Sequence, residues 1–217
     1  MKRILIVLVC SITLFSSCNK ETVRGRGAII TETRALPAFT NVELGGGGDA
    51  AINYGVVYNV TLTGYQNLLP IYETKVAGNT LYLQFKPNVY NVRNNNIKAI
   101  VTLPALAGMR INGSGKMEAK NFVNTNLTVS INGSGYIFIG NSQYNTASYS
   151  INGSGKIDAG GTEVAEATAH ISGSGDIELK AVIKLKATIA GSGNIIYLGN
   201  PATVETQVSG SGKITRR

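Results

Sequence analysis

The tripeptide Gly-Ser-Gly recurs six times in this chain of 217 residues, and it constrains the fold more than any other feature. An isoleucine or valine stands two positions before every copy, and an isoleucine or methionine stands four positions after its first glycine. The spacings are 20, 20, 20, 18 and 19 residues, with copies beginning at Gly113, Gly133, Gly153, Gly173, Gly191 and Gly210. A period held in register over six copies indicates a stack of similar units.

Within each repeat, apolar and polar residues alternate. Leu127, Val129 and Ile131 alternate with Thr128 and Ser130, for example. A period of two predicts β-strand rather than helix. A unit this small cannot bury its apolar face alone, and 20 extended residues make a circuit of about 65 Å. We therefore predict an all-β fold, a β-helix-like solenoid with coils of about 20 residues. A β-sandwich is the alternative, which the near-constant spacing disfavours.

The glycines and their neighbours have predictable roles at the corners of the coils. A sharp corner requires residues that accept positive φ, which glycine does at little cost. An asparagine precedes three of the turns, at Asn112, Asn132 and Asn152. We expect stacking to align these asparagines in a ladder, and the turn serines in a second ladder, with side chains bonded to the coils above and below.

The region before the repeats is less regular. Residues 36–104 contain strand-like segments and six of the ten tyrosines, and Gly45 to Gly48 resembles a degenerate copy of the turn. No linker separates this region from the repeats at 105–217. We therefore expect residues 36–217 to form one domain, in which 36–104 begins or caps the solenoid.

The first residues resemble an export signal. Lys2 and Arg3 precede an apolar run of 12 residues, and Ser16 and Ser17 stand directly before Cys18. Such a run is too short to span a bilayer as a helix, and small residues before a cysteine are typical of a lipoprotein signal. We predict a signal peptide at 1–17, lipidation of Cys18 and a polar tether at 18–35. The alternative is an ordinary secretory signal cleaved near Ser17.

Cleavage would leave Cys18 as the single cysteine, which excludes a disulfide within the mature chain and a site built from several thiolates. It would also lower the formal net charge from +8 to +6 by removing Lys2 and Arg3. The remaining basic residues are spread along the chain, whereas a nucleic-acid-binding protein concentrates them. We predict a membrane partner through the lipid anchor and no nucleic-acid partner.

Three segments resemble a known family: Leu36-Pro37-Ala38-Phe39-Thr40-Asn41-Val42, the pair Asn67-Leu68-Leu69 and Gly78-Asn79-Thr80-Leu81, and the repeated Ile-Asn-Gly-Ser-Gly. They are similar to the head GIN domain family, whose members are described as auto-transporter adhesins and are common among exported lipoproteins of Bacteroidetes-type bacteria. The resemblance covers about residues 36–217. It implies a right-handed, β-helix-like fold, and it supplies no catalytic residues.

Two catalytic motifs are only superficially similar to the repeat. Asn-Gly-Ser-Gly-Lys lacks the P-loop spacing, since Arg110 occupies the position of its first glycine and Met117 that of its serine or threonine. A nucleophile elbow also fails, because Ser114 lacks glycine at two positions on either side. The single histidine, His170, has no cysteine or second histidine to join it and is expected to face solvent.

Carboxylates offer the one enzymatic alternative. Glu118, Asp158 and Glu178 each stand five residues after a first turn glycine, on the predicted outer face, in a column that Phe138 interrupts. Paired carboxylates serve glycoside hydrolysis or bind Ca²⁺. The neighbouring lysines Lys156 and Lys180 favour a charge-balanced surface instead. We therefore predict no catalytic residues, no metal and no cofactor.

The best binding candidates are aromatic side chains near a flat array of hydroxyls, because sugar rings stack on aromatic faces. We select Tyr65, Tyr72 and Tyr90. The leading hypothesis is a non-enzymatic outer-membrane lipoprotein, on the periplasmic face or the cell surface, that binds polysaccharide or another envelope component, including an envelope protein. The alternatives are a polysaccharide lyase or glycosidase on the same solenoid, and a purely structural envelope module. The oligomeric state is left open.

Overall fold

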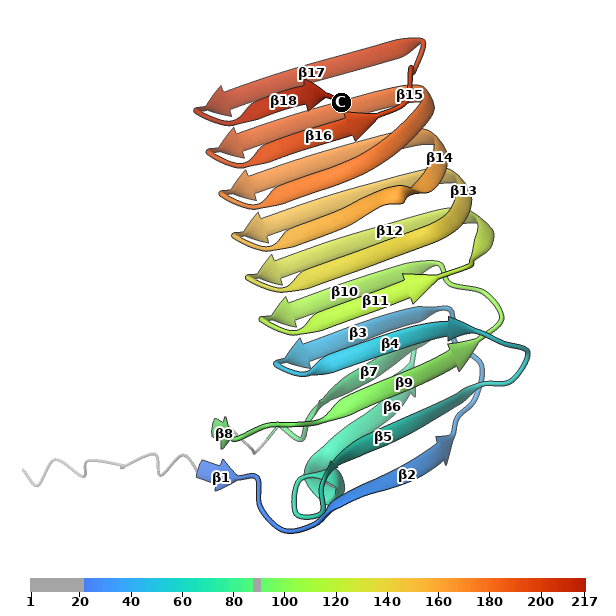
Figure 1. Ribbon diagram of the computed structural model, residues 1–217, viewed down its shortest axis with the longest axis vertical. Coiled ribbons are helices and arrows are strands. Elements are labelled where there is room, and N and C mark those ends of the chain that lie inside the picture. Colours follow the sequence, from blue (N-terminus) through green and yellow to red (C-terminus); the bar gives the residue numbers. More distant parts are fainter. Residues whose placement is uncertain (1–21, 88–90) are drawn as a thin grey trace, which may run out of the picture.

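The computed structural model describes residues 22–87 and 91–217. The predicted signal peptide at 1–17, the lipidation site Cys18 and the candidate Tyr90 lie outside these residues. The described chain forms 18 strands and one short 3₁₀ helix, and it contains no α-helix. The strands stack into an elongated solenoid, which confirms the predicted β-solenoid fold (Figure 1).

Each coil of the solenoid contributes a strand segment to each of two faces of one wrapped sheet, and within each face the strands of neighbouring coils pair in parallel. The strands that run into a Gly-Ser-Gly turn form the entry face: β10 (Gly108–Gly113), β12 (Val123–Gly133), the second halves of β13 (Tyr136–Gly153), β14 (Lys156–Gly173) and β15 (Asp176–Gly191), and β17 (Thr203–Gly210). The strands that leave the turn form the exit face: β11 (Lys116–Lys120), the first halves of β13, β14 and β15, β16 (Asn194–Leu198) and β18 (Lys213–Arg216).

The turns explain why glycine occupies both ends of the tripeptide. Gly133 has φ of 131°, and a Cβ there would collide with the carbonyl oxygen of Gly113 in the coil below. Gly135 is buried, and a Cβ there would lie 2.9 Å from the carbonyl oxygen of Gly115. The first position therefore requires an unusual φ, and both positions require close approach of stacked backbones.

One of the two predicted side-chain ladders is present. The Asn132 amide donates to Asn112 Oδ1 at 2.9 Å, and the Asn152 amide donates to Asn132 Oδ1 at 3.1 Å. The serine ladder was predicted wrongly, because the turn serines are exposed and their hydroxyls form no bonds along the described column. Their backbone N–H groups make the link instead, as from Ser134 to the Gly113 carbonyl oxygen at 3.0 Å.

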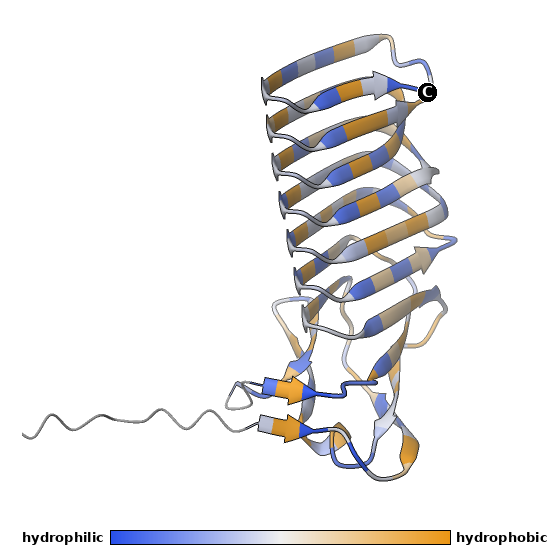
Figure 2. Ribbon diagram, turned by 60° about the vertical axis from the view of Figure 1, so that its left-hand side comes forward, coloured by the Kyte–Doolittle hydropathy of each residue, from blue (hydrophilic) through white to orange (hydrophobic). Residues whose placement is uncertain are grey.

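Aliphatic and aromatic side chains fill the space between the two faces. Their columns follow the strand register, in which Ile131 lies beside Ile151 and Val129 beside Tyr149. All four side chains are fully buried. Figure 2 shows the resulting alternation of apolar and polar residues along the strands. A single core therefore runs through the stack, as predicted for units that cannot fold alone.

The first coil is degenerate but in register with the repeats. β3 (Asn41–Gly46) pairs in parallel with β10, and β4 (Asp49–Tyr54) pairs in parallel with β11. Gly46 is the register partner of Gly113 and has φ of 81°. The interpretation of Gly45 to Gly48 as a copy of the turn is confirmed.

Antiparallel pairs close the solenoid beyond this coil. On the exit face, β9 (Lys98–Leu103) lies parallel to β4, and β5 (Asn59–Tyr65) and β2 (Ile29–Ala35) follow as antiparallel neighbours. On the entry face, β7 (Thr80–Phe85) lies parallel to β3, and β6 (Tyr72–Ala77) pairs antiparallel with β7. The 3₁₀ helix η1 (Leu69–Ile71) precedes β6 and buries Leu69. Residues 36–104 thus contribute the degenerate first coil and most of the capped end.

The prediction of a polar tether at 18–35 is wrong from residue 22 onward. β1 (Thr22–Arg24) pairs in parallel with β8 (Asn91–Arg93), and β2 is a seven-residue strand. Hydroxyl groups link β2 to β5, with 2.9 Å between Thr31 and Thr63. The segment is polar because β2 is an edge strand with mostly exposed side chains, and its order comes from pairing with a strand about 30 residues away.

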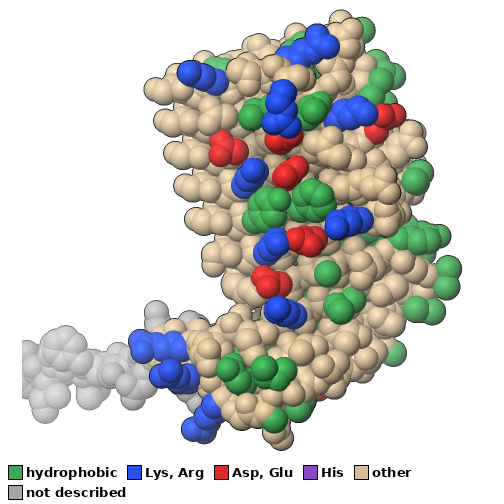
Figure 3. All heavy atoms as spheres, viewed as in Figure 1, with side chains coloured by type: hydrophobic (Ala, Val, Ile, Leu, Met, Phe, Trp, Pro, Cys, Tyr) green, Lys and Arg blue, Asp and Glu red, His purple; other side chains and the backbone are tan. Residues whose placement is uncertain are grey.

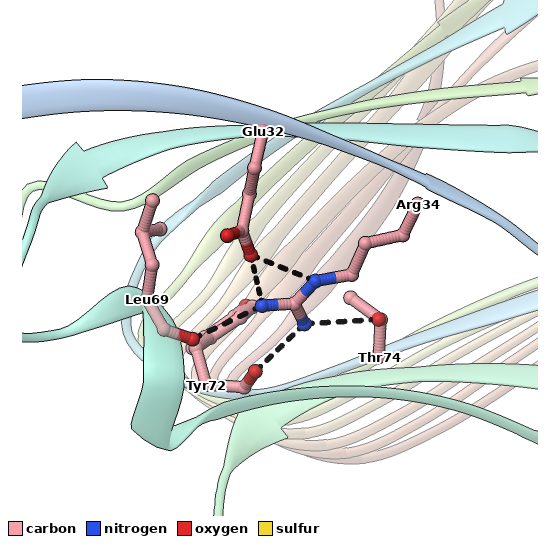
Figure 4. Close-up of polar contacts among 5 residues, drawn as sticks. All are labelled: Glu32, Arg34, Leu69, Tyr72 and Thr74. Atoms are coloured by element: carbon pink, nitrogen blue, oxygen red, sulfur yellow. Dashed lines mark hydrogen bonds and ion pairs between the residues drawn. The ribbon is translucent and has the colours of Figure 1, made fainter.

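A partly buried guanidinium links the two faces at the capped end. Arg34 on β2 donates to the carbonyl oxygens of Tyr72 at 2.8 Å and Leu69 at 3.0 Å, and to the Thr74 hydroxyl at 3.0 Å (Figure 4). It also forms an ion pair with Glu32. These contacts join the edge strand of the exit face to η1 and the edge strand of the entry face.

The opposite end of the stack is open. Val204 and Val208 on β17 continue the buried columns of Leu185 and Ile189, but they are 42% and 43% exposed, since β15 is the one strand that pairs with β17 among the described residues. On β18, Arg216 is the register partner of Tyr197. The two ends of the solenoid thus differ, one capped and one uncovered (Figure 1).

Candidate functional site

The two described tyrosine candidates lie on different faces. Tyr65 is a half-buried residue at the end of β5 on the exit face, where it packs against the core. Tyr72 begins β6 on the entry face and is only 2% exposed, with its ring edge-on to Phe85 at 5.1 Å. Burial raises the pKa of the Tyr72 hydroxyl. Tyr72 is therefore a core residue that offers no free ring face to a ligand, and the two tyrosines do not form one surface.

The outer side of the entry face is an array of hydroxyl and amide groups. Near the capped end this array has a shallow hollow of about 480 Å³. Arg110 and Glu43 lie within it, with 3.7 Å between Arg110 Nε and Glu43 Oε2. Tyr82 and Ser130 also line it. The hollow combines hydrogen-bonding groups with one half-buried aromatic ring.

The exit face carries an aromatic pair that the sequence argument did not identify as a site. Tyr136 and Phe138 are both outward residues of β13, two positions apart, and both are half-buried. Lys116 Nζ lies 5.7 Å from the centroid of the Tyr136 ring, and Lys120 Nζ lies 5.6 Å from that of Phe138. We call Tyr136 and Phe138 the aromatic platform.

Glycine determines how the Phe138 ring lies. A Cβ at Gly140 would come within 2.8 Å of Phe138 Cζ, so the ring occupies the space that a side chain at Gly140 would fill. The ring therefore lies over the sheet instead of projecting from it. The only sequence signal for this arrangement was an aromatic residue at an outward position, followed two positions later by glycine.

Charged side chains surround the aromatic platform. Lys116 forms an ion pair with Glu118 at 2.6 Å, and this hydrogen bond raises the pKa of Lys116. Lys156 and Asp158 are the register partners of Tyr136 and Phe138 on the next coil. Burial, followed by the nearby Asp158 carboxylate, raises the pKa of Tyr136. Figure 3 shows basic, acidic and apolar side chains grouped at mid-height on this face.

The carboxylate column has the predicted register, and two of its members, Glu118 and Glu178, form ion pairs. Asp158 and Glu178 are register partners, as expected. Glu178 pairs with Arg217, and Lys180 pairs with Glu163 at 2.9 Å. Among the described residues, no three His, Cys, Asp or Glu side chains are grouped to hold a metal ion.

His170 is exposed, between Ser150 and Thr188 of the adjacent coils. No helix in residues 22–87 and 91–217 has the length and apolarity needed to cross a membrane.

A capped, two-faced stack of parallel coils with Gly-Ser-Gly corners places the chain among the all-β solenoid proteins. More specifically, the chain belongs to the family described as "Putative auto-transporter adhesin, head GIN domain", which matches residues 38–201. The family resemblance noted from the sequence is thereby confirmed. No curated protein matches the chain.

Several solved structures share the fold. A putative adhesin from Bacteroides fragilis is 22% identical with a TM-score of 0.73, and the match covers 90% of this chain and 100% of that one. A putative lipid binding protein from Parabacteroides distasonis is 23% identical with a TM-score of 0.60, covering 91% and 100%. A putative adhesin from Parabacteroides merdae is 24% identical with a TM-score of 0.52, covering 90% and 99%. At these identities the likeness concerns the fold.

Proposed function

We propose that this protein is a non-enzymatic, lipid-anchored binding protein of the cell envelope that holds polysaccharide on the aromatic platform. The observation that carries this proposal is the placement of Tyr136 and Phe138 on a flat sheet among charged groups. Adhesin is also the description of the family. The platform replaces Tyr72 as the aromatic surface of the binding hypothesis, because Tyr72 is buried.

The chemistry of the platform suits a sugar ring. The C–H face of a pyranose packs on an aromatic ring, while its hydroxyl groups need hydrogen-bonding partners at the edge of that ring. Lys120 and Asp158 flank Phe138 and provide a donor and an acceptor. Neighbouring strands of the exit face lie about 4.8 Å apart. A chain of sugars bound at the platform can therefore contact side chains of more than one coil.

Ion pairing supports binding over hydrolysis. A glycosidase requires one carboxylic acid to donate a proton and a second carboxylate nearby as base or nucleophile. Glu118 is paired with Lys116, and Glu178 with Arg217. Neither carboxylate can therefore approach a glycosidic bond without first breaking an ion pair.

The proposed location in the outer membrane rests on the sequence around Cys18. Small residues at Ser16 and Ser17 before this cysteine support cleavage and lipidation there, in an outer-membrane lipoprotein. Protease treatment of intact cells tests which membrane face carries the solenoid. Digestion without lysis supports a surface adhesin, and protection until lysis supports a periplasmic binding protein.

Glycan-array binding of purified protein tests the platform. Phe138→Ala removes one of the two rings of the platform, and we expect about a tenfold loss of affinity for the glycans that the unmodified protein retains. Tyr82→Ala is the matched control, since it removes an aromatic ring from the hollow on the opposite face. Equal binding by all three proteins contradicts the proposal, and loss only in Tyr82→Ala moves the site to the entry face. Release of reducing sugar from the bound glycans contradicts a non-enzymatic role.

A further inference from the structure

The capped end of the solenoid carries a second charged feature, on the small sheet formed by β1 and β8. Val23 and Val92 are register partners on its inner side and pack against the core. Arg24 and Arg93 are register partners one position further along, so both side chains lie on the outer side, where they are exposed. The pairing of these strands therefore places two arginines side by side on neighbouring strands.

A third arginine joins them. Arg24 and Arg26 line one shallow hollow of about 320 Å³ together with Thr22, Val23 and Asn67. Asn67 holds this segment in place, because its Oδ1 accepts from the Arg26 N–H at 2.9 Å and its amide donates to the Arg24 carbonyl oxygen at 2.9 Å. None of the described residues that line the hollow is a carboxylate. We call Arg24, Arg26 and Arg93 the arginine cluster.

The charges of the arginine cluster are uncompensated within the described part of the chain. Like charges directly opposite each other on neighbouring strands are unfavourable. Arg34, Arg110 and Arg217 each have a carboxylate partner, whereas none of the three cluster residues pairs with one among residues 22–87 and 91–217. An anion seated between these guanidinium groups would relieve the repulsion, and guanidinium matches phosphate oxygens in geometry.

We propose that the arginine cluster binds the phosphate groups of acidic phospholipids, so that the solenoid stands with its capped end on the membrane. The choice of lipid rests on the proposed anchor. Thr22, the first residue of β1, is four residues from Cys18, and four residues span at most about 14 Å. An acyl chain on Cys18 therefore holds the cluster at the headgroup layer, while the open end of β17 and β18 points away (Figure 1).

Vesicle sedimentation tests this proposal on the mature chain, residues 18–217, with Cys18→Ser so that no acyl chain contributes. The probes are phosphatidylethanolamine vesicles with and without phosphatidylglycerol. The test variant is R24Q/R26Q/R93Q. The matched control is K156Q/K186Q/K213Q, which removes the same charge from exposed lysines far from the capped end. Each basic residue near an acidic surface contributes about fivefold in affinity, so the arginine variant should bind more than tenfold more weakly.

Binding of the unmodified protein and the lysine control to acidic vesicles, with loss in the arginine variant, supports the proposal. An equal loss in both variants shows that net charge alone is responsible and overturns it. Failure of the unmodified protein to bind acidic vesicles also overturns it. Displacement by millimolar inorganic phosphate would identify a site for small anions instead of a lipid surface. Glycan binding involves other residues and needs no vesicle, so failure here is distinguishable from failure of the proposed function.

Discussion

Individual residues in the core show where the packing is complete and where it is not. Tyr144 and Tyr149 are two large buried side chains on β13. The Tyr144 hydroxyl donates to the carbonyl oxygen of Leu106 at 3.2 Å. The Tyr149 hydroxyl is fully buried and has no hydrogen-bond partner among the described residues. An unpaired buried hydroxyl costs about 1–3 kcal/mol, so Tyr149 is a position where the native side chain reduces stability.

Tyr149→Phe should therefore stabilise the protein, by about 1 kcal/mol, because it removes the unpaired hydroxyl and keeps the ring that fills the core. Urea unfolding with an unchanged m-value measures this gain. Tyr144→Phe is the control and should be neutral or destabilising, since it loses a hydrogen bond. A loss of stability in Tyr149→Phe would show that the hydroxyl has a partner, such as a buried water.

A turn glycine in the middle of the stack should tolerate no side chain. Gly153→Ala places a Cβ against the carbonyl oxygen of Gly133 and forces alanine to φ of 131°. Backbone strain of this kind costs up to about 3 kcal/mol, and the collision adds to it. Gly78→Ala is the comparison, because its φ of 55° is also positive but no atom lies within 4 Å of the added Cβ. Equal losses of melting temperature would contradict the role assigned to close stacking.

The elements at the capped end differ from those in the repeats. In the repeats, every strand except β17 and β18 of the last described coil has a parallel neighbour on both sides, so the backbone groups of one coil bond to those of the next. At the capped end, the edge strands β2 and β6 lie on different faces and are joined through Arg34. Antiparallel pairing and this guanidinium close a sheet edge that would otherwise be open to another chain.

Arg34→Gln should lower the free energy of unfolding by about 2 kcal/mol, because the carbonyl oxygens of Leu69 and Tyr72 lose a charged donor. Arg110→Gln is the matched control. Its ion pair with Glu43 is exposed and spans 3.7 Å, so its loss should cost less than about 0.5 kcal/mol. Similar stability changes in the two variants would show that the hydrogen bonds of Arg34 to η1 and β6 do not stabilise the capped end.

The molecule as a whole is a one-dimensional stack of coils, and its two ends differ in how far the core is covered. Strand pairing and η1 close the first end. The last coil leaves Val204 and Val208 partly exposed, yet Arg216 occupies a column that Leu179 and Tyr197 fill in the preceding coils. A charged residue at such a position is unfavourable for the addition of a further coil. The two ends of the described stack therefore differ: strand pairing and η1 cover the first, and a charged residue stands at the edge of the second.

Alkaline pH should unfold this protein through its buried tyrosines. Burial raises the pKa of Tyr72, Tyr144 and Tyr149 in the folded state above the ordinary value of 10.0. Above pH 10 the unfolded chain therefore releases protons that the folded chain retains, so stability is full below that pH and falls as pH rises. Melting temperature between pH about 9 and about 12 measures the decline. Tyr149→Phe should have a shallower slope, and a melting temperature independent of pH would contradict the argument.

Much of the solenoid is predictable from the chain alone, because the information is repeated in it. The Gly-Ser-Gly period and the alternation of residues specify coil length, inner columns and the asparagine ladder. Even the degenerate turn at Gly45 to Gly48 follows from that pattern. Each of these features depends on residues one coil apart. Residues that are one repeat apart in the sequence are therefore neighbours in the structure.

The cap and the candidate binding surfaces depend on contacts that no period encodes. The strand at Ile29–Ala35 exists because β5 offers it an edge, and Tyr72 is buried because β6 covers the end of the core. The aromatic platform requires Gly140 beneath the Phe138 ring and lysines from the preceding coil beside it. Repetition thus specifies the stack in advance, whereas the closure of its end and the grouping of its outer side chains arise only when distant strands pair.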